Sequence, residues 1–202
     1  MLKSKYIIHL FVFTYLSINA VAQHEISKYE IRWAVFHPLA AIKIKVRLKK
    51  AMVIYHEVKN TKQLDNFESG GNLDAFRHSF TMAYLAQRIR IRKLRKLGTA
   101  HEKGNKRQFE KHKTEHGERA DSLACEMDLR NNELGFFIGC NNRKLSKEEL
   151  RNIIIGQIKS GNAWCLKRNN NNEYVTCDNN PVLMENFREK WFVPKCLTKS
   201  NE

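Results

Sequence analysis

Three short motifs place ionisable and amide side chains inside segments that otherwise predict buried helix. In the first motif, Asp74 and His78 stand four residues apart, so on a helix they share one face. This spacing suits joint coordination of one divalent metal, or a carboxylate that orients an imidazole. Two structural interpretations compete with it. Asp74 in a first helical turn simply favours the helix dipole, and His78 in a core needs only a hydrogen-bond partner.

The second motif adds a further imidazole and carboxylate, His101 and Glu102, to the candidate site. Adjacent residues on a helix point about 100° apart. We therefore expect only one of the two to face the site. The competing interpretation is a surface pair beside a basic segment.

The third motif carries Asp128, Asn131 and Asn132 among apolar residues. Buried carboxylates and amides need partners, so these side chains predict either a site or a polar network. Gly135 lies on the same helical stripe as Asp128 and Asn132, where a missing side chain lets another helix approach closely. An exposed polar face is the simpler alternative.

Together the motifs resemble a bacterial domain family of unknown function that occurs in secreted proteins and at the ends of toxin-like polypeptides. Its pattern is roughly Asp-Ala-aromatic-Arg-His-Ala, then Ala-His-Glu, then Glu-Met-Asp-x-x-Asn-Asn-x-x-Gly. The chain matches it at 74–79, 100–102 and 126–135, within a motif core of about 70–140. Ser79 replaces the last alanine of the first motif, and the lysine-rich segment 103–119 is longer than usual. The resemblance implies a site and names no reaction.

A metal-dependent hydrolase is the first functional hypothesis. Its metal, with Zn²⁺ as the first choice, would be held by Asp74, His78, His101 and Asp128. Glu102 would be the general base, with His101 as a further proton carrier. Arg77 would pair with a negative group, and Asn131 or Asn132 would orient the substrate. A bound metal lowers the pKa of its water toward ~7.

Two alternatives remain open. One is a metal-free enzyme in which His78 or His101 is the base, positioned by Asp74 or Asp128. The other is a non-enzymatic basic helical module that binds an anionic surface, with the Asp/His/Asn cluster as a structural network. Known catalytic motifs do not decide between these hypotheses. The chain lacks a Gly-rich phosphate loop, a Gly-x-Ser-x-Gly elbow and a His-Glu-x-x-His helix.

Charge indicates the class of partner. The formal net charge is +15, and the segment Arg88–Arg119 has twelve Lys or Arg against four Glu. Such a segment favours a phosphate-containing partner, either a phospholipid, a nucleic acid or an anionic surface. A solvated helix face that aids solubility would look the same.

The patterning predicts a mainly α fold, a single helical domain over 23–202 with a small C-terminal β-hairpin. The stretch 39–58 alternates like a strand, but Pro38 and its length favour a helix. Asn72 is expected to cap the next helix. The polar segment at about 103–117 predicts a mobile basic loop, and 164–166 with 174–177 predict the hairpin.

Residues 1–22 have the pattern of an export signal, with Lys3 and Lys5 before an apolar run and Ala20-Val21-Ala22 before the cut. A membrane anchor is the alternative. Export, to the periplasm or beyond, would allow cysteines to oxidise. Cys140, Cys165, Cys177 and Cys196 could then form two bridges, with three possible connectivities. We favour Cys165 with Cys177, because these two flank the predicted hairpin.

Overall fold

The computed structural model describes residues 26–111 and 119–202. The expected export signal at 1–22 lies outside this range, as does the end of the expected loop. In the described residues no helix is long and apolar enough to cross a membrane.

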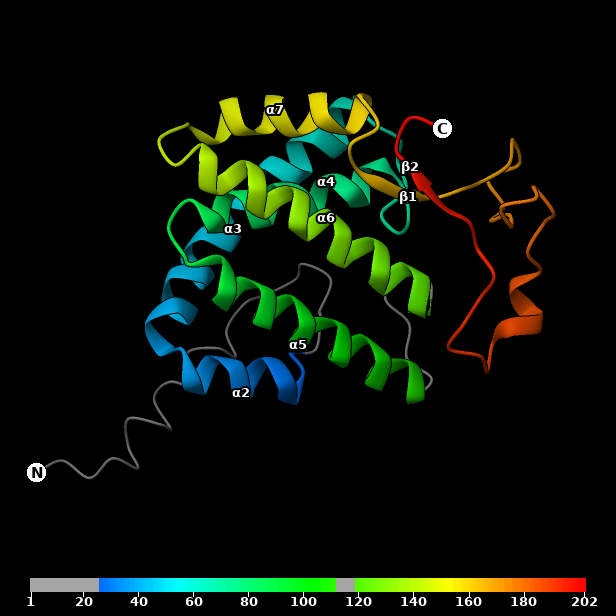
Figure 1. The fold of residues 1–202 in the computed structure, drawn as a ribbon, viewed down its shortest axis with the longest axis horizontal. Helices are drawn as coiled ribbons and strands as arrows, with labels where there is room; N and C mark the ends of the chain where they lie inside the picture. Colours follow the sequence, from blue (N-terminus) through cyan, green and yellow to red (C-terminus); the bar gives the residue numbers. More distant parts are fainter. Residues whose placement is uncertain (1–25, 112–118) are drawn as a thin grey trace, which may run out of the picture.

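The described residues are mainly helical, as expected, with six α-helices and one two-stranded sheet (Figure 1). The helices are α2 (Lys28–Phe36), α3 (Pro38–Thr61), α4 (Asn72–Ala86), α5 (Ile91–Glu110), α6 (Ser122–Asn141) and α7 (Lys147–Lys159). A 3₁₀ turn, η1 (Met184–Phe187), lies in the C-terminal region between β1 (Trp164–Leu166) and β2 (Leu197–Lys199).

Helix α4 forms the centre of the bundle. It packs against α3, α6 and α7, and its apolar residues Leu73, Phe76 and Phe80 are fully buried. The rings of Phe76 and Phe80 stack with centroids 5.2 Å apart. A helix buried on several sides can hold polar residues only where neighbouring elements supply partners, and α4 holds Asp74 and His78.

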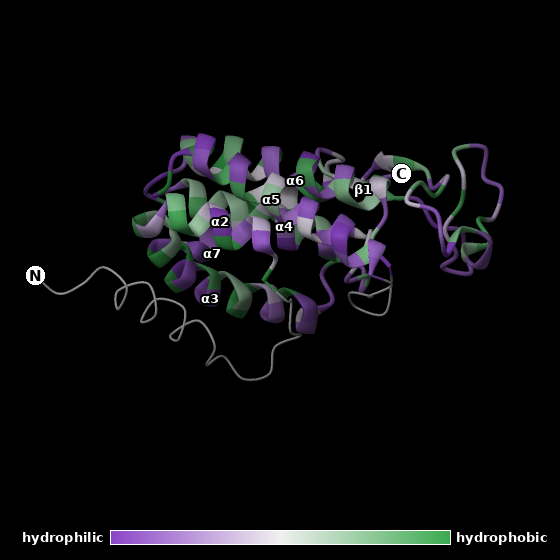
Figure 2. Ribbon diagram, turned by 90° about the horizontal axis from the view of Figure 1, so that it is seen from below, coloured by the Kyte–Doolittle hydropathy of each residue, from purple (hydrophilic) through white to green (hydrophobic). Residues whose placement is uncertain are grey.

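Helix α3 confirms the helical interpretation of the alternating stretch. Pro38 occupies its first turn, where a missing N–H costs nothing. Its buried face includes Ala51, Ile54 and Val58. Hydrophobic and hydrophilic residues alternate along α3, as the colours of its ribbon show (Figure 2).

The expected loop at about 103–117 was wrong for its first part, because α5 continues to Glu110. The continuation of the helix beyond Glu102 was missed because the buried residues of this part, Gly104 and Asn105, are small and polar. These give no apolar period. At Gly104 a Cβ atom would come within 2.7 Å of the Ser27 side chain. Helix α5 therefore approaches the N-terminus of α2 closely at this point.

The expected cap of α4 was also wrong. Gly71 is the N-cap residue, without a side-chain hydrogen bond. The carboxylate of Asp65 accepts from the backbone N–H groups of Asn72 and Leu73 instead, at 2.6 and 3.1 Å. A residue from the preceding loop therefore does what a local N-cap usually does.

The C-terminal hairpin exists, but its second strand is not 174–177. Strand β1 pairs antiparallel with β2, with Cys165 opposite Thr198. Cys177 is bonded to Cys196, so the expected pairing with Cys165 was wrong. Both errors have one cause, since contacts between residues that are 19 positions apart, as in the disulfide, or about thirty apart, as in the strand pair, leave no local sequence pattern.

Candidate metal centre

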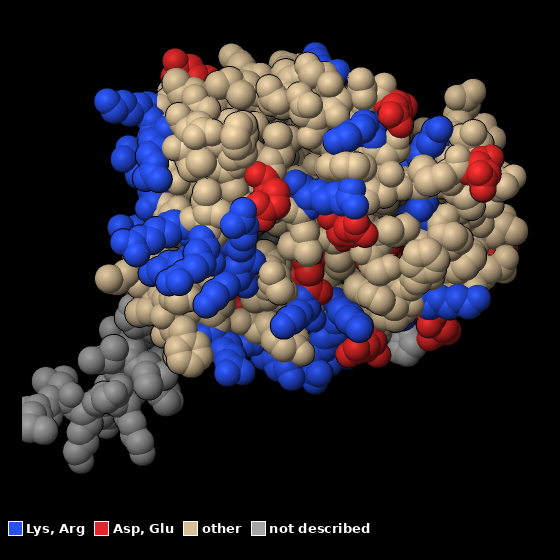
Figure 3. Space-filling view, in the orientation of Figure 1, with Lys and Arg blue, Asp and Glu red and all other residues tan. Residues whose placement is uncertain are grey.

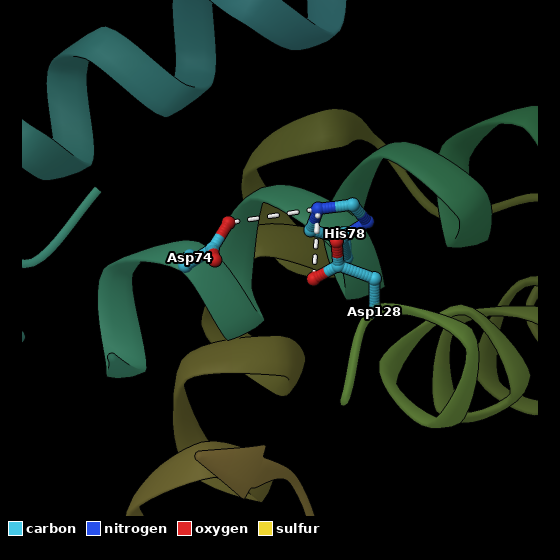
Figure 4. Close-up of side chains that lie close together, drawn as sticks. All are labelled: Asp74, His78 and Asp128. Atoms are coloured by element: carbon cyan, nitrogen blue, oxygen red, sulfur yellow. Dashed lines mark ion pairs between the residues drawn. The ribbon is translucent and has the colours of Figure 1, made fainter. Parts of the chain in front are cut away.

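Three buried side chains from two helices meet at one point. Asp74 and His78 come from α4 and Asp128 from α6 (Figure 4). The Nε2 atom of His78 lies 3.5 Å from Oδ1 of Asp74 and 3.2 Å from Oδ1 of Asp128. One ligand atom from each residue lies within 4.8 Å of the other two. The expected convergence of these three residues is therefore found.

Close packing of α4 and α6 creates this meeting point. A Cβ atom on Gly135 would lie 2.3 Å from the carbonyl oxygen of Ser79. One on Gly139 would lie 2.1 Å from the carbonyl oxygen of Ala83. Only glycine permits this separation of the two backbones, so the expected close approach at Gly135 is confirmed.

Asp74 is held as a carboxylate. Its Oδ1 accepts from both Nε and a terminal nitrogen of Arg77, at 3.0 and 2.6 Å. Its Oδ2 accepts from the backbone N–H of Gly70 at 2.8 Å. Burial alone would raise the pKa of Asp74, but the charge of Arg77 and these hydrogen bonds outweigh it and lower the pKa.

His78 is held as a neutral imidazole. Burial, and then the positive charge of Arg77, lowers its pKa to about 3, although Asp74 acts in the opposite direction. Its Nδ1 lies 3.4 Å from Oδ1 of Asn132. With Nδ1–H donating to Asn132, Nε2 turns a lone pair toward two carboxylates.

That arrangement suits a cation. Two carboxylates and an imidazole lone pair around one point repel each other unless a positive ion or a proton lies between them. Nε2 of His78 has no hydrogen-bond partner among the described residues. Neutral imidazole and carboxylate are the ligands that Zn²⁺ and similar divalent ions use, and a partner on Nδ1 is the usual support for a metal-binding histidine.

A small cavity of about 40 Å³ adjoins the cluster. This is room for one or a few water molecules. Glu68, Asp74, Asp121 and Asp128 line it, together with the cationic side chains of Arg77, Arg119 and Lys195. The cavity therefore presents charges of both signs, and Arg77 and Lys195 are already paired with Asp74 and Asp121.

Glu102 belongs to a neighbouring polar group. It is buried on α5 and accepts from the side-chain amide of Asn105 at 2.9 Å. Burial, followed by the charge and hydrogen bond of Glu102, raises the pKa of the Cys125 thiol, so the thiol donates to Glu102. Asn105 and Cys125 both line the cavity, which brings this group next to the three converging residues.

His101 and Asn131 are placed differently. His101 is not one of the converging residues, and its Nδ1 lies 3.3 Å from Oε1 of Glu30 on α2. It remains near enough to contribute to the lowered pKa of His78. The amide of Asn131 donates to and accepts from the backbone of Trp164, at 2.9 and 3.0 Å, which joins α6 to β1.

Sequence reasoning missed three residues that surround the cavity. Asn105 was assigned to the loop. Asp121 and Lys195 form a buried ion pair of 2.8 Å, with Asp121 also accepting at the N-terminus of α6. An Asp before an apolar run was a readable cap signal, whereas no local pattern identifies Lys195.

Comparison with known proteins shows the family of the chain. A family model matches residues 31–162, which include all three motifs. Neither the curated proteins nor the solved structures give a match to the chain. The family is described only as a domain of unknown function, so it adds no reaction to the geometry. The chain belongs to the DUF6973 family, a domain of unknown function.

Proposed function

We propose that this protein is an exported metal-dependent hydrolase. The observation that carries the proposal is the convergence of Asp74, His78 and Asp128 beside a small cavity. Asp74, His78 and Asp128 would hold one divalent ion, with Zn²⁺ as the first candidate. Such an ion supplies Lewis acidity and a water of lowered pKa.

The surrounding side chains would bind and orient. Arg77 holds Asp74 ionised, and Asn132 fixes the orientation of the His78 ring. Glu102 is the candidate general base, because it is a buried carboxylate whose neighbours Asn105 and Cys125 line the cavity.

The substrate class follows from charge. Carboxylates and cations share the lining of the cavity, so the preference rests on α5 and its C-cap, which carry a row of exposed lysines and arginines. These are Arg92, Arg95, Lys96, Lys103, Lys106, Arg107 and Lys111. Positive charge favours a phosphate-containing substrate, of which a phosphodiester is the first choice.

Export is proposed on two grounds. Residues 1–22 have the pattern of a secretory signal. The disulfide between Cys177 and Cys196 suits the oxidising environment outside the cytoplasm.

Metal content tests the proposal directly. The purified protein is dialysed against Zn²⁺, then against buffer, and its metal is measured by mass spectrometry with binding followed by calorimetry. We expect about one ion per chain, and a loss of at least tenfold in affinity for His78→Ala and for Asp128→Asn. Hydrolysis of bis(p-nitrophenyl) phosphate should be lost with the metal.

His101→Asn is the matched control, because that imidazole pairs with Glu30 outside the cluster. It should retain the ion, whereas a loss equal to that of His78→Ala would return His101 to the ligand set. Circular dichroism of each variant separates lost binding from lost fold. Absence of stoichiometric metal, or unchanged activity in His78→Ala, would contradict the proposal.

One observation favours a second candidate, a basic module with a structural polar network. Both oxygens of Asp74 already have protein partners, Arg77 and Gly70. In that case Asp128→Asn would lower the free energy of unfolding. The wild type itself would show no detectable metal binding. Anion binding would then depend on the α5 cations and weaken as salt is added.

A further inference from the structure

An exposed apolar stripe runs along α3, on the face opposite its buried side. Leu39, Ile42, Val46 and Val53 are 75, 46, 54 and 53% exposed. Their spacing of three, four and seven residues places them in one line along the helix. At the start of α3 the stripe meets Phe36 of α2, which is 67% exposed. We call these five residues the α3 stripe.

Lysines flank the α3 stripe. At 100° per residue, Lys43 and Lys50 lie along one edge and Lys49 along the other. All three are exposed. The stretch 31–56 contains six Lys or Arg and no Asp or Glu. Lys and Arg gather along the left edge of the molecule in Figure 3, where Figure 1 places the first part of α3 together with the α4–α5 and α6–α7 connections.

This combination distinguishes between kinds of anionic partner. A nucleic acid would use the lysines but would leave the branched apolar side chains in water. A bilayer uses both, because the apolar side chains enter the boundary of the acyl chains while the lysines meet anionic headgroups. Long lysine side chains at the edges of an apolar face suit this geometry.

We propose that the α3 stripe docks this protein on the surface of an anionic lipid bilayer, with α3 lying in the plane of the interface. The docking surface is separate from the converging residues Asp74, His78 and Asp128, which are buried on α4 and α6. The proposal therefore does not depend on metal binding or on hydrolysis.

Vesicle binding tests the proposal on the full chain. Vesicles of phosphatidylcholine with 30% phosphatidylglycerol are compared with vesicles of phosphatidylcholine alone by co-sedimentation. We expect at least tenfold tighter binding to the anionic vesicles, weakening as salt is raised. The double variant Ile42→Gln/Val46→Gln should bind at least tenfold more weakly, and so should Lys49→Gln/Lys50→Gln.

Matched controls remove equally exposed residues elsewhere. Phe137 and Leu183 are 67 and 58% exposed, and Phe137→Gln/Leu183→Gln should bind like the wild type. Lys159→Gln/Lys190→Gln is the corresponding control for charge, because both lysines are exposed. All variants retain residues 1–25, so equal binding by all of them would assign binding to that segment and overturn the proposal.

Two other results would overturn it. Equal affinity for neutral and anionic vesicles would show that the lysines do not contribute to binding. A wild-type dimer in light scattering that becomes a monomer in Ile42→Gln/Val46→Gln would show that a second copy covers the stripe. Thermal unfolding of each variant should be unchanged, because the replaced side chains are exposed and glutamine keeps helix propensity.

Discussion

His78 is the residue on which the cluster depends most. It lies between two carboxylates on one side and an amide on the other. Its imidazole is neutral because burial disfavours the charged ring. A neutral ring is also the form that binds a metal. Burial therefore keeps His78 in the protonation state that the proposed ion would need.

The same electrostatics make stability depend on pH. The pKa of His78 is about 3 in the folded protein, against 6.5 as its ordinary value. Between these values the unfolded chain binds a proton that the folded protein does not. The free energy of unfolding should therefore fall as pH falls from 6.5 toward 3, by at most about 1.4 kcal/mol per pH unit from this group.

Urea unfolding at several pH values, with a chelator present, measures this slope. His78→Gln should have a shallower slope than the wild type, since the replaced side chain does not titrate. His56→Gln is the control, because His56 is exposed on α3. An unchanged slope in His78→Gln would show that other groups cause the acid sensitivity.

At the scale of elements, the pair α4–α6 decides the geometry of the site. Gly135 and Gly139 set the distance between the helices, because an added Cβ atom would lie 2.3 and 2.1 Å from carbonyl oxygens of the α4 backbone. Asp128 lies two turns before Gly135 on the same helix. Any added side chain at the glycines would push Asp128 away from His78.

Gly139→Ala should destabilise the fold. Its Cβ would meet the carbonyl oxygen of Ala83 at 2.1 Å, and backbone cannot yield as a flexible side chain does. We expect a loss of about 2 kcal/mol or more in the free energy of unfolding, measured by urea denaturation.

Gly156→Ala on α7 is the matched control. An added Cβ meets nothing within 4 Å there, so the replacement should stabilise the helix by about 0.5–1 kcal/mol. Similar effects of the two substitutions would mean that α4 and α6 are not held by close backbone contact.

At the scale of the whole molecule, the C-terminal region closes the fold over α6 and the cavity. Lys195 reaches Asp121 at the start of α6, and Ser122 donates its backbone N–H to the carbonyl of Trp191. The disulfide between Cys177 and Cys196 fixes the chain beside Lys195. Reduction should therefore loosen one wall of the cavity.

The bond joins residues separated by 19 positions, for which loop closure predicts about 3 kcal/mol of stabilisation. Dithiothreitol should lower the free energy of unfolding by about this amount. Cys177→Ser/Cys196→Ser should show the same loss without the reductant and no further response to it. Cys140→Ser is the control, since that cysteine is free; a normal response to reductant in the double variant would assign the effect elsewhere.

Local signals in the sequence identified most of the helices. The capping box of Ser146 with Glu149 marks α7, and Pro38 marks α3. The spacing of Asp74 and His78 was readable for the same reason, because residues four apart on a helix share a face. The convergence with Asp128 was suggested only by the joint occurrence of the motifs.

The sequence by itself determined the helical class, the family and the pair on α4, since each depends on residues close together in the chain. Tertiary structure alone decided the partner of β1, the disulfide, the direction of His101 and the place of Lys195. These contacts join segments tens of residues apart, and the free energy that selects them comes from packing, which has no local signature. Helix α5 lies between the two cases. It is a local element, but its buried face includes the small and polar residues Gly98, Glu102, Gly104 and Asn105. That these residues are buried follows only from the packing of α5 against neighbouring helices.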